Sequence, residues 1–296
     1  MTPAPLKFSV VVPACDRPEQ LAQCLARLAP GTQTFPAANY ELIVTDDSRS
    51  SVVRELVEKQ FPWAKWTAGP RQGPAANRNH GAEQTLQDWI AFTDDDCLPD
   101  HGWLAAFAET ISAAADNTSP DVLEGRTYAD RSKHSLAERA PINSHGGYLW
   151  SCNLAIKADW FRRLGGFDTG FPFASMEDVD FARRLRAAGA REQFVAAAGV
   201  CHPWRDIGGF CAMWTVEKKH FASVKYYLQQ YPAARAMHTP LGYLKMNARQ
   251  LVRETLPGVW RWRGRGFSAA LAWHLHTLIS AFALMKIPRS HSAKST

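Results

Sequence analysis

Several features that would assign this chain to a familiar class are missing. The six cysteines of the 296-residue sequence form no C-x-x-C pair and lack the dense spacing of a disulfide scaffold, so we expect structural thiols in a reducing compartment. No strand pattern is followed by G-x-G-x-x-G, which argues against a dehydrogenase. The first residues, Met1 to Lys7, contain no apolar segment of a secretory signal, and the expected location is therefore the cytoplasm.

Acidic residues are nearly absent from the C-terminal part of the chain. Residues 241–296 contain one acid, Glu254, and nine bases. The bases are Lys245, Arg249, Arg253, Arg261, Arg263, Arg265, Lys286, Arg289 and Lys294. Subtracting these ten residues from the totals of 34 bases and 28 acids leaves 25 bases and 27 acids in residues 1–240. The formal net charge of +6 is therefore the sum of a tail at +8 and a slightly acidic body at −2.

The body of the chain alternates between strand and helix patterns. Its 46% hydrophobic and 21% charged residues exclude a disordered chain, and its length allows one large domain or two smaller ones. Over the first 115 residues, the expected strands are Phe8–Pro13, Glu41–Thr45 and Trp89–Thr93. Helices are expected to begin near Pro18, Val52, Pro74 and Pro99. This alternation predicts an α/β fold with a mainly parallel central sheet flanked by helices.

After about residue 121 the alternation is less regular. Further strands are expected at Val122–Tyr128, near Leu149–Ile156 and at Phe194–Cys201. Helices are expected at Lys157–Leu164 and from Glu177 onward. The remaining chain has helical patterns interrupted at Pro232, Pro240 and Pro257. We therefore expect a C-terminal helical extension on the α/β fold.

Two of the expected strands end in runs of aspartate. Asp46-Asp47 follows the second strand, and Asp94-Asp95-Asp96, which contains D-x-D, follows the strand at residue 89. Ligands bind at the carboxyl ends of strands in such sheets, and adjacent carboxylates favour a hard divalent ion, Mg²⁺ or Mn²⁺. The alternative for the three-residue run is an acidic loop that starts the next helix. For Asp46-Asp47 the alternatives are helix capping and a hydrogen bond to a base or ribose.

Glu177-Asp178 and His202 can likewise each be explained by a functional role or by a structural one. Glu177-Asp178 falls in the first turn of a helix, where the dipole keeps a carboxylate ionised, as a general base for a sugar hydroxyl requires. Ordinary acidity of a helix N-terminus is the alternative. His202 follows a strand and is either a metal ligand or a structural histidine.

In this order, the motifs closely resemble the family 2 glycosyltransferases of GT-A fold over roughly residues 7–205. Three stretches carry the resemblance: Ser9–Pro18 as the first strand and turn, Gly73–Ala82 as the third helix, and Leu164–Asp168 followed by Glu177–Asp180 as the acceptor-side segment. Two positions depart from the family pattern. Asn77 stands where a small residue is usual, and Asp16 stands where Asn is common.

The resemblance implies a role for each matching residue on the donor side. Pro13, Ala14, Asp16 and Asp47 would line the nucleoside pocket, with Asp47 on the base. Arg78 would lie near the phosphates or brace the acidic turn. Asp94 and Asp95 would contact the ribose and the diphosphate, and Asp96 with His202 would bind Mg²⁺ or Mn²⁺.

On the acceptor side, Asp178 matches the family's catalytic base, and Glu177 beside it is assigned to acceptor binding. Trp150 and Trp204 are candidate stacking platforms for sugar rings, with Trp214 as a third, although core packing is the better expectation for at least one of them.

The activity implied is inverting transfer of a sugar from a nucleoside-diphosphate donor to a hydroxyl of a glycan or lipid-linked acceptor, in cell-surface polysaccharide synthesis. Residues 1–210 would form the GT-A domain, with a nucleotide-sugar half (1–120) and an acceptor half (121–210), and residues 211–296 the helical region. A sugar-phosphate nucleotidyltransferase is the rival enzyme, but Pro13–Pro18 lacks the glycine of its usual loop. A catalytically silent sugar-nucleotide-binding or scaffold protein at the membrane is disfavoured by the intact acidic motifs.

The basic tail gives two expectations for the C-terminal region. Residues 259–267 interleave arginines with aromatic residues ahead of an expected helix over Ser268–Met285. One face of that helix carries Leu271, Leu275, Leu278, Phe282 and Met285. Polar residues interrupt the apolar run, so we expect no spanning helix but an interfacial helix on anionic lipid at the inner face of the cell membrane. Packing on the catalytic domain is the equal alternative, and no nucleic-acid module is recognised.

Overall fold

The computed structural model describes residues 5–114 and 118–285. They divide into two units, here named the sheet unit and the helical unit. The sheet unit comprises Met1–Asp130, Ala140–Gly170 and Glu177–Pro203. The helical unit comprises Arg131–Arg139, Phe171–Met176 and Trp204–Thr296. The domain boundary at residue 210 stays a prediction, since the units change over between Pro203 and Trp204 and two earlier segments belong to the helical unit.

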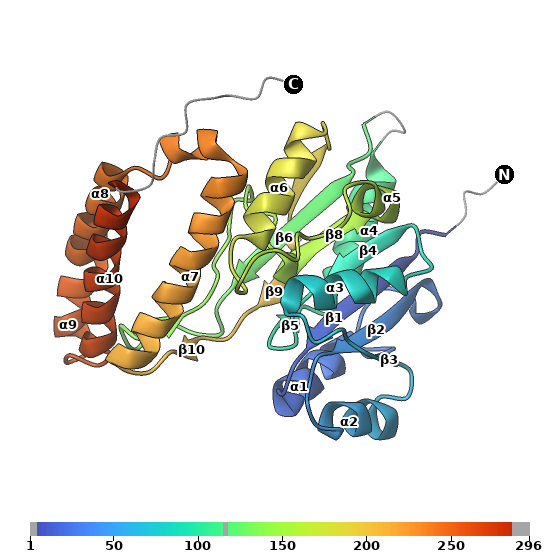
Figure 1. The fold of residues 1–296 in the computed structure, drawn as a ribbon. Coiled ribbons are helices and arrows are strands. Elements are labelled where there is room, and N and C mark those ends of the chain that lie inside the picture. Colours follow the sequence, from blue (N-terminus) through green and yellow to red (C-terminus); the bar gives the residue numbers. More distant parts are fainter. Residues whose placement is uncertain (1–4, 115–117, 286–296) are drawn as a thin grey trace. The chain divides into compact units, whose positions relative to one another are not determined.

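The sheet unit is built on eight strands in the order β3-β2-β1-β4-β8-β6-β9-β5 (Figure 1). The strands are β1 (Phe8–Ala14), β2 (Tyr40–Asp46), β3 (Lys65–Ala68), β4 (Trp89–Phe92), β5 (Leu98–Pro99), β6 (Val122–Tyr128), β8 (Leu154–Lys157) and β9 (Glu192–Cys201). β1, β2, β3 and β4 are mutually parallel, as are β6 and β9, whereas β8 and β5 pair antiparallel with their neighbours. The expected α/β fold with a mainly parallel central sheet is confirmed.

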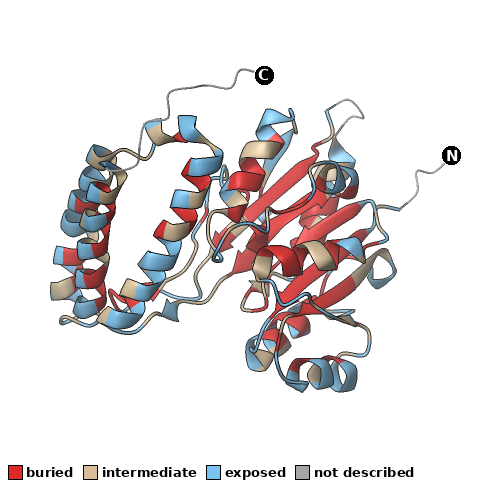
Figure 2. Ribbon diagram, in the orientation of Figure 1, coloured by how far each residue is buried: buried red, intermediate tan, exposed pale blue. Residues whose placement is uncertain are grey.

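Helices cover both faces of this sheet. They are α1 (Pro18–Leu28), α2 (Val52–Gln60), α3 (Pro74–Glu83), α4 (Trp103–Ala113), α5 (Ala158–Arg163) and α6 (Glu177–Ala187). Because side chains alternate along a strand, Val10 and Val12 of β1 pack with α1, α2 and α4, whereas Val11 packs with α3, α5 and α6. Figure 2 shows the resulting burial of the central strands. Burial on both faces explains why these strands are continuously apolar rather than alternating.

Two expected element boundaries are wrong for local reasons. The helix expected near Pro99 begins at Trp103, because Leu98–Pro99 forms the edge strand β5, where proline's missing N–H is tolerated. The strand expected near Leu149 begins at Leu154, after a short 3₁₀ helix over Ser151–Asn153. The buried Glu124 carboxylate accepts the Leu149 N–H and holds that residue at a φ of 54°, outside strand geometry.

The helical unit contains one small sheet and a set of long helices. β7 (Glu138–Arg139) pairs antiparallel with β10 (Arg205–Asp206). The helices are α7 (Phe210–Gln230), α8 (Pro240–Gln250), α9 (Leu256–Arg261) and α10 (Phe267–Met285), with a 3₁₀ helix at Pro232–Ala236. A π-helical turn over Leu251–Thr255 joins α8 to α9. This π-helical turn is the interruption expected at Pro257, and the proline lies in the first turn of α9, where no N–H is needed.

Helix α10 directs its small and polar side chains inward and its large apolar side chains outward. Its buried residues, which face α7 and α8, are Ala269, Ala270, Ala272, His276, Thr277, Ser280 and Ala281. Its exposed large apolar residues are Phe267, Leu271, Leu275, Ile279, Phe282 and Met285. By length and composition α10 could cross a membrane, and 39% of its apolar window is buried within the protein. Of the tail's bases, Lys286, Arg289 and Lys294 lie outside the described residues.

Candidate active site

The two aspartate runs lie side by side at one edge of the sheet. β1 lies between β2 and β4 and is parallel to both, so the carboxyl ends of these three strands meet. Asp46 ends β2 in register with Ala14 of β1, and Asp94–Asp96 follows β4. The sequence-based expectation that these carboxylates converge thus agrees with the topology.

Asp47 lies in a tight turn directly after β2. Its Oδ1 accepts the Arg71 N–H at 2.8 Å, and burial raises the pKa of its carboxyl group. A Cβ at Gly69 would come within 2.3 Å of this oxygen and of Asn77 Oδ1, so only glycine fits there. Capping by Asp47 is wrong, because α2 begins at Val52 with Ser51 as its N-cap residue. The Asp47 side chain is instead held at the strand end.

Asn77 ties the ends of β1 and β2 together. Its Nδ2 donates to Thr45 O at 2.9 Å and to Ala14 O at 3.3 Å, and Thr45 Oγ1 donates to its Oδ1 at 2.7 Å. Ala14 and Pro13 are both buried in β1. A small residue at position 77 would leave these carbonyl groups without this donor, which explains the departure from the family pattern.

Asp16 lies in the turn between β1 and α1 at a φ of 52°. Its N–H donates to Ser48 Oγ at 2.7 Å, and its Oδ1 accepts the Arg49 N–H at 3.3 Å. Asparagine and aspartate tolerate this left-handed conformation better than most residues, so either fits the turn. Asp16 thereby links the turn after β1 to the turn after β2.

The acidic turn after β4 is partly neutralised by Arg17. This guanidinium contacts Asp95 Oδ1 at 2.8 Å and Asp96 Oδ2 at 2.5 Å. Burial and the neighbouring carboxylates raise the pKa of Asp95 to about 7, against the lowering effect of Arg17. Our sequence analysis assigned no role to Arg17, although it lies within the first strand-and-turn motif. Its pairing depends on how close two strand ends come, which that motif does not specify.

Arg78 of α3 connects the acidic turn to the start of α6. Its Nη2 lies 2.6 Å from Asp94 Oδ1, and its Nη1 lies 3.6 Å from Glu177 Oε1. Burial alone would raise the pKa of Asp94 and lower that of Arg78, but their mutual attraction shifts both in the opposite direction, so both remain charged. The contact with Asp94 is the one expected of a brace for the acidic turn, and the expected place of Arg78 near the phosphates stays a prediction.

Glu177 and Asp178 begin α6 and lie in a confined environment. Burial and the adjacent Asp178 raise the pKa of Glu177 to about 7, and burial also raises the pKa of Asp178. Ser151 donates hydrogen bonds to the Asp178 carboxylate from its hydroxyl and its backbone N–H. Among the described residues, Glu177 Oε2 and Asp178 Oδ1 are buried and find no hydrogen-bond partner. Each therefore has an unused hydrogen-bond acceptor.

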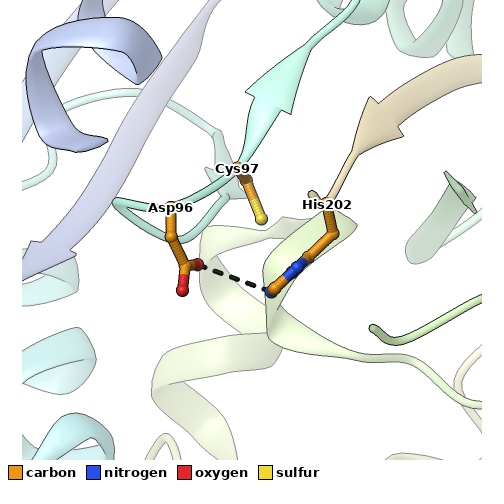
Figure 3. A group of neighbouring side chains, drawn as sticks. All are labelled: Asp96, Cys97 and His202. Carbon is orange, nitrogen blue, oxygen red and sulfur yellow. Dashed lines mark ion pairs between the residues drawn. The ribbon is translucent and has the colours of Figure 1, made fainter. Parts of the chain in front are cut away.

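Asp96 and His202, the expected metal ligands, lie together with Cys97 (Figure 3). His202 Nε2 is 3.5 Å from Asp96 Oδ1, and one ligand atom from each of the three residues lies within 4.8 Å of the others. His202 Nδ1 is 3.2 Å from Pro203 O, which favours a proton on Nδ1 and leaves the Nε2 lone pair directed at Asp96. Cys97 was missed by the sequence analysis because cysteine is no part of an acidic motif.

The tryptophans expected to bind sugar rings are divided between the two units. Trp150, in the sheet unit, stacks on the exposed Tyr148 with ring centroids 4.5 Å apart. In the helical unit, Trp204 Nε1 donates to Arg131 O at 2.7 Å, and Trp214 stacks on Phe210 and contacts His276. Trp214 is thus used in packing, as expected for at least one of the three.

Parallel strands that end in paired carboxylates, linked through Arg78 to an acidic helix start, are arranged as in the GT-A fold. The described fold is similar to that of Staphylococcus aureus TarS 1–349, with a TM-score of 0.55, 16% identity, and 94% of this chain and 89% of that chain covered. The model of the family described as Glycosyl transferase family 2 matches residues 9–164. The chain therefore belongs to glycosyltransferase family 2, and it is a glycosyltransferase.

Curated relatives carry glycosyltransferase names. The chain is 28% identical over 218 residues to glycosyltransferase AglE of Haloferax volcanii, covering 68% of each protein. It is 34% identical over 146 residues to the pre-mycofactocin glycosyltransferase of Mycobacterium tuberculosis, covering 45% of this chain and 31% of that protein. The match thus spans about a third of the mycobacterial relative.

Proposed function

We propose that the chain transfers a sugar, with inversion, from a nucleoside-diphosphate sugar to a hydroxyl group of a glycan or lipid-linked acceptor in cell-surface polysaccharide synthesis. One observation carries this proposal. Arg78 contacts Asp94 in the strand-end turn and Glu177 beside Asp178, so a donor-side acid and an acceptor-side acid belong to one buried network. An inverting transfer needs both groups near one sugar carbon.

On the donor side we assign the nucleoside to Pro13, Ala14, Asp16 and Asp47. We assign the ribose and diphosphate to Arg78, Asp94 and Asp95. Support comes from two solved structures of similar fold: S. aureus TarS 1–349 in complex with UDP, and GalNAc-T7 with UDP, GalNAc and Mn²⁺. We therefore propose that this chain binds a nucleoside diphosphate together with a divalent ion.

The carboxylate and imidazole groups of this region suit a divalent cation. Five carboxylates, those of Asp94, Asp95, Asp96, Glu177 and Asp178, share the region with two guanidinium groups, those of Arg17 and Arg78. This excess of negative charge disfavours a diphosphate unless a cation accompanies it. Asp96 and His202 would hold the ion, Mg²⁺ or Mn²⁺, with the imidazole ligand favouring Mn²⁺. When bound, the ion neutralises charge that develops on the leaving diphosphate.

Asp178 is the proposed general base. The Ser151 hydrogen bonds orient its carboxylate, and its free Oδ1 accepts the proton of the acceptor hydroxyl. The hydroxyl oxygen bonds to the anomeric carbon on one face while the bond to the diphosphate oxygen breaks on the other, which inverts the configuration. We assign Trp150, Glu177 and Trp204 to acceptor binding, where stacking rings and a hydrogen-bonding carboxyl group suit a sugar.

Metal-dependent release of nucleoside diphosphate from a panel of nucleotide sugars tests this proposal. Wild-type protein should release product with Mn²⁺ or Mg²⁺, and Asp96→Ala should lose both this release and metal-dependent nucleotide binding. The matched control, Asp159→Asn, changes an exposed carboxyl group on α5 and should behave as wild type. Full activity of Asp96→Ala would refute the metal assignment. Pyrophosphate release from a sugar phosphate and a nucleoside triphosphate would indicate a nucleotidyltransferase instead.

We further propose that residues 1–210 act as the catalytic domain and that residues 211–296 hold it at the inner, cytoplasmic face of the cell membrane. Large apolar side chains are exposed on α8, α9 and α10. They include Leu241, Leu244, Leu256, Trp260, Phe267, Leu271, Leu275, Ile279, Phe282 and Met285. Six bases are exposed in the same region, namely Lys245, Arg249, Arg253, Arg261, Arg263 and Arg265. Apolar side chains with nearby positive charge suit a surface of anionic lipid.

Sedimentation with vesicles tests the membrane proposal. The full chain should sediment with phosphatidylglycerol-containing vesicles and much less with pure phosphatidylcholine. Salt should weaken the binding without abolishing it, because the charge component is screened and the apolar component is not. Equal partitioning to both vesicle types, or none to either, would contradict the proposal.

A further inference from the structure

A cysteine sulfur, that of Cys97, lies beside Asp96 and His202, the two proposed cation ligands. Asp96 and Cys97 come from the turn after β4, and His202 follows β9 (Figure 3). The 3.5 Å between Asp96 Oδ1 and His202 Nε2 is close to the ~3.4 Å that separates two ligands bound at ~2.1 Å to a tetrahedral Zn²⁺. The Cys97 sulfur lies within 4.8 Å of a carboxylate oxygen of Asp96 and of a ring nitrogen of His202.

We infer that Cys97 is a third protein ligand of this site, which therefore binds thiophilic ions such as Zn²⁺, Co²⁺ and Cd²⁺ more tightly than Mg²⁺ or Mn²⁺. A carboxylate, an imidazole and a thiolate are together a typical zinc donor set, whereas hard ions prefer oxygen ligands. The inference rests on the proposed function in one respect, namely that Asp96 and His202 hold a cation.

The Cys97 side chain is fully buried, and its sulfur is hydrogen-bonded to Cys152. When an ion binds, the S–H bond breaks, the sulfur–metal bond forms, and one proton leaves to solvent. The charge of the ion then offsets the cost of a buried thiolate.

Cys152 provides the thiolate with a hydrogen-bond partner. It lies in the 3₁₀ helix over Ser151–Asn153, is itself buried, and already contacts the Cys97 sulfur. Once Cys97 is deprotonated, its sulfur can only accept, so the Cys152 S–H becomes the donor. Such outer partners orient a metal ligand and strengthen its binding. The two sulfur atoms thus have different roles, one as ligand and one as support.

Titration of the full-length, metal-free, reduced protein with Co²⁺ tests this inference. A bound thiolate gives a sulfur-to-cobalt charge-transfer band in the near ultraviolet, which carboxylate and imidazole ligands do not give. The band should appear in the wild type and in Cys211→Ser, a control at an exposed cysteine of the helical unit. It should be absent in Cys97→Ser and Cys97→Ala.

Affinity and proton release give two further readouts. Zn²⁺ affinity, measured by competition with a chelator, should fall by at least about tenfold in Cys97→Ser, and Mn²⁺ affinity should change far less. Zn²⁺ binding to the wild type should release one proton more than binding to Cys97→Ser. Equal losses of Zn²⁺ and Mn²⁺ affinity would mean that the substitution only disturbs the site and would overturn the inference.

Measurements on the wild-type protein distinguish failure of the Cys97 inference from failure of the proposed function. If it shows Mn²⁺-dependent release of nucleoside diphosphate but no charge-transfer band with Co²⁺, Cys97 is not a ligand and the proposed function stands. If the band forms but no nucleotide sugar is turned over, the thiolate site stands and the proposed function fails. A band that persists in Cys97→Ala would also refute the assignment, and that variant is checked for folding by its thermal unfolding.

Discussion

The two units of the molecule place polar and apolar side chains in opposite ways. In the sheet unit, large apolar residues fill the interior, and a cluster of buried charges lies where the strands end. In α10 of the helical unit, alanines and polar residues lie inside, and leucine, isoleucine and phenylalanine side chains face outward. In the sheet unit, the buried charges are the departure from ordinary packing that indicates function. In the helical unit, the exposed apolar side chains of α10 are that departure.

The buried polar groups of the two units are also stabilised differently. Asp94 and Asp95 depend on Arg78 and Arg17, which come from distant parts of the chain. In α10, Thr277 Oγ1 donates to Trp273 O at 2.8 Å, a local bond one helical turn away. Removing one partner of these ion pairs should therefore lower the free energy of unfolding strongly. In α10 the partner is a backbone group one turn away, which a substitution elsewhere in the chain does not remove.

The largest expected effect is on catalysis by the sheet unit. Asp178→Asn removes the proposed base with little change in shape, so the rate of sugar transfer should fall by about 10²- to 10⁴-fold. Nucleotide and metal binding should be retained, because the proposal assigns Asp178 to the acceptor and not to the nucleotide or the metal. Steady-state rates and nucleotide titration measure the two quantities. A rate that stays within a few-fold of wild type would show that Asp178 is not the base.

The next effect concerns the stability of the buried charges. Arg78→Met leaves Asp94 and Glu177 without their shared cation, and the free energy of unfolding at pH 8 should fall by about 3–5 kcal/mol. Arg78 holds the pKa of Asp94 low, so its contribution is present above the unfolded pKa and is lost as pH falls. The difference between variant and wild type should therefore persist down to about pH 4 and shrink only below the unfolded pKa of 3.8. Urea unfolding at several pH values measures it.

Arg54→Met is the matched control for that substitution. Arg54 pairs with Glu58 on the exposed surface of α2, so its loss should cost no more than about 0.5 kcal/mol. Equal losses for the two arginines would mean that the Arg78 network does not stabilise the sheet unit.

A pair of substitutions in α10 tests its reversed packing. Ala272→Leu adds volume to the buried side and should lower the free energy of unfolding by about 1–3 kcal/mol. Leu275→Ser, on the exposed side, should change it by less than about 0.5 kcal/mol and weaken sedimentation with anionic vesicles. The reverse result, with Leu275→Ser the more destabilising, would mean that this face is covered within the protein.

The last effect is a dependence of stability on pH. The pKa of Glu177 is raised from 4.5 to about 7, so its contribution to stability is fully present below pH 4.5 and is lost as pH rises towards 7. The slope is at most about 1.4 kcal/mol per pH unit for one proton. Glu177→Gln should flatten the curve of unfolding free energy against pH in this range. A curve that keeps its wild-type slope in the variant would assign the dependence to another group.

The sequence predicted those features whose signals are local. Continuous β-branched runs specify buried parallel strands, and aspartates directly after them must lie at the same sheet edge. Asp47, Asp94 and Asp96 therefore converge as expected. Gly73 and Pro74 likewise predicted the start of α3 correctly. The roles of these residues stay predictions, because geometry alone does not identify a substrate.

Features that depend on distant partners were not predictable in the same way. Arg17 and Cys97 owe their importance to strand ends that approach in space, and no spacing in the sequence encodes that approach. In α10 the periodicity correctly located one apolar face, including Leu271 and Leu275, but periodicity does not reveal whether a face points inward. The π-helical turn over Leu251–Thr255 also shifted the phase of the helical pattern.

The row of exposed apolar side chains on α10 has a consequence for the purified protein. In dilute buffer without lipid, nothing in solution shields Leu271, Leu275, Ile279 and Phe282 from water. Copies of the chain will therefore associate as concentration rises, and a mild detergent will reverse the association. Leu275→Ser should raise the concentration at which larger species appear in size-exclusion chromatography. Handling conditions for this enzyme thus follow from the orientation of a single helix.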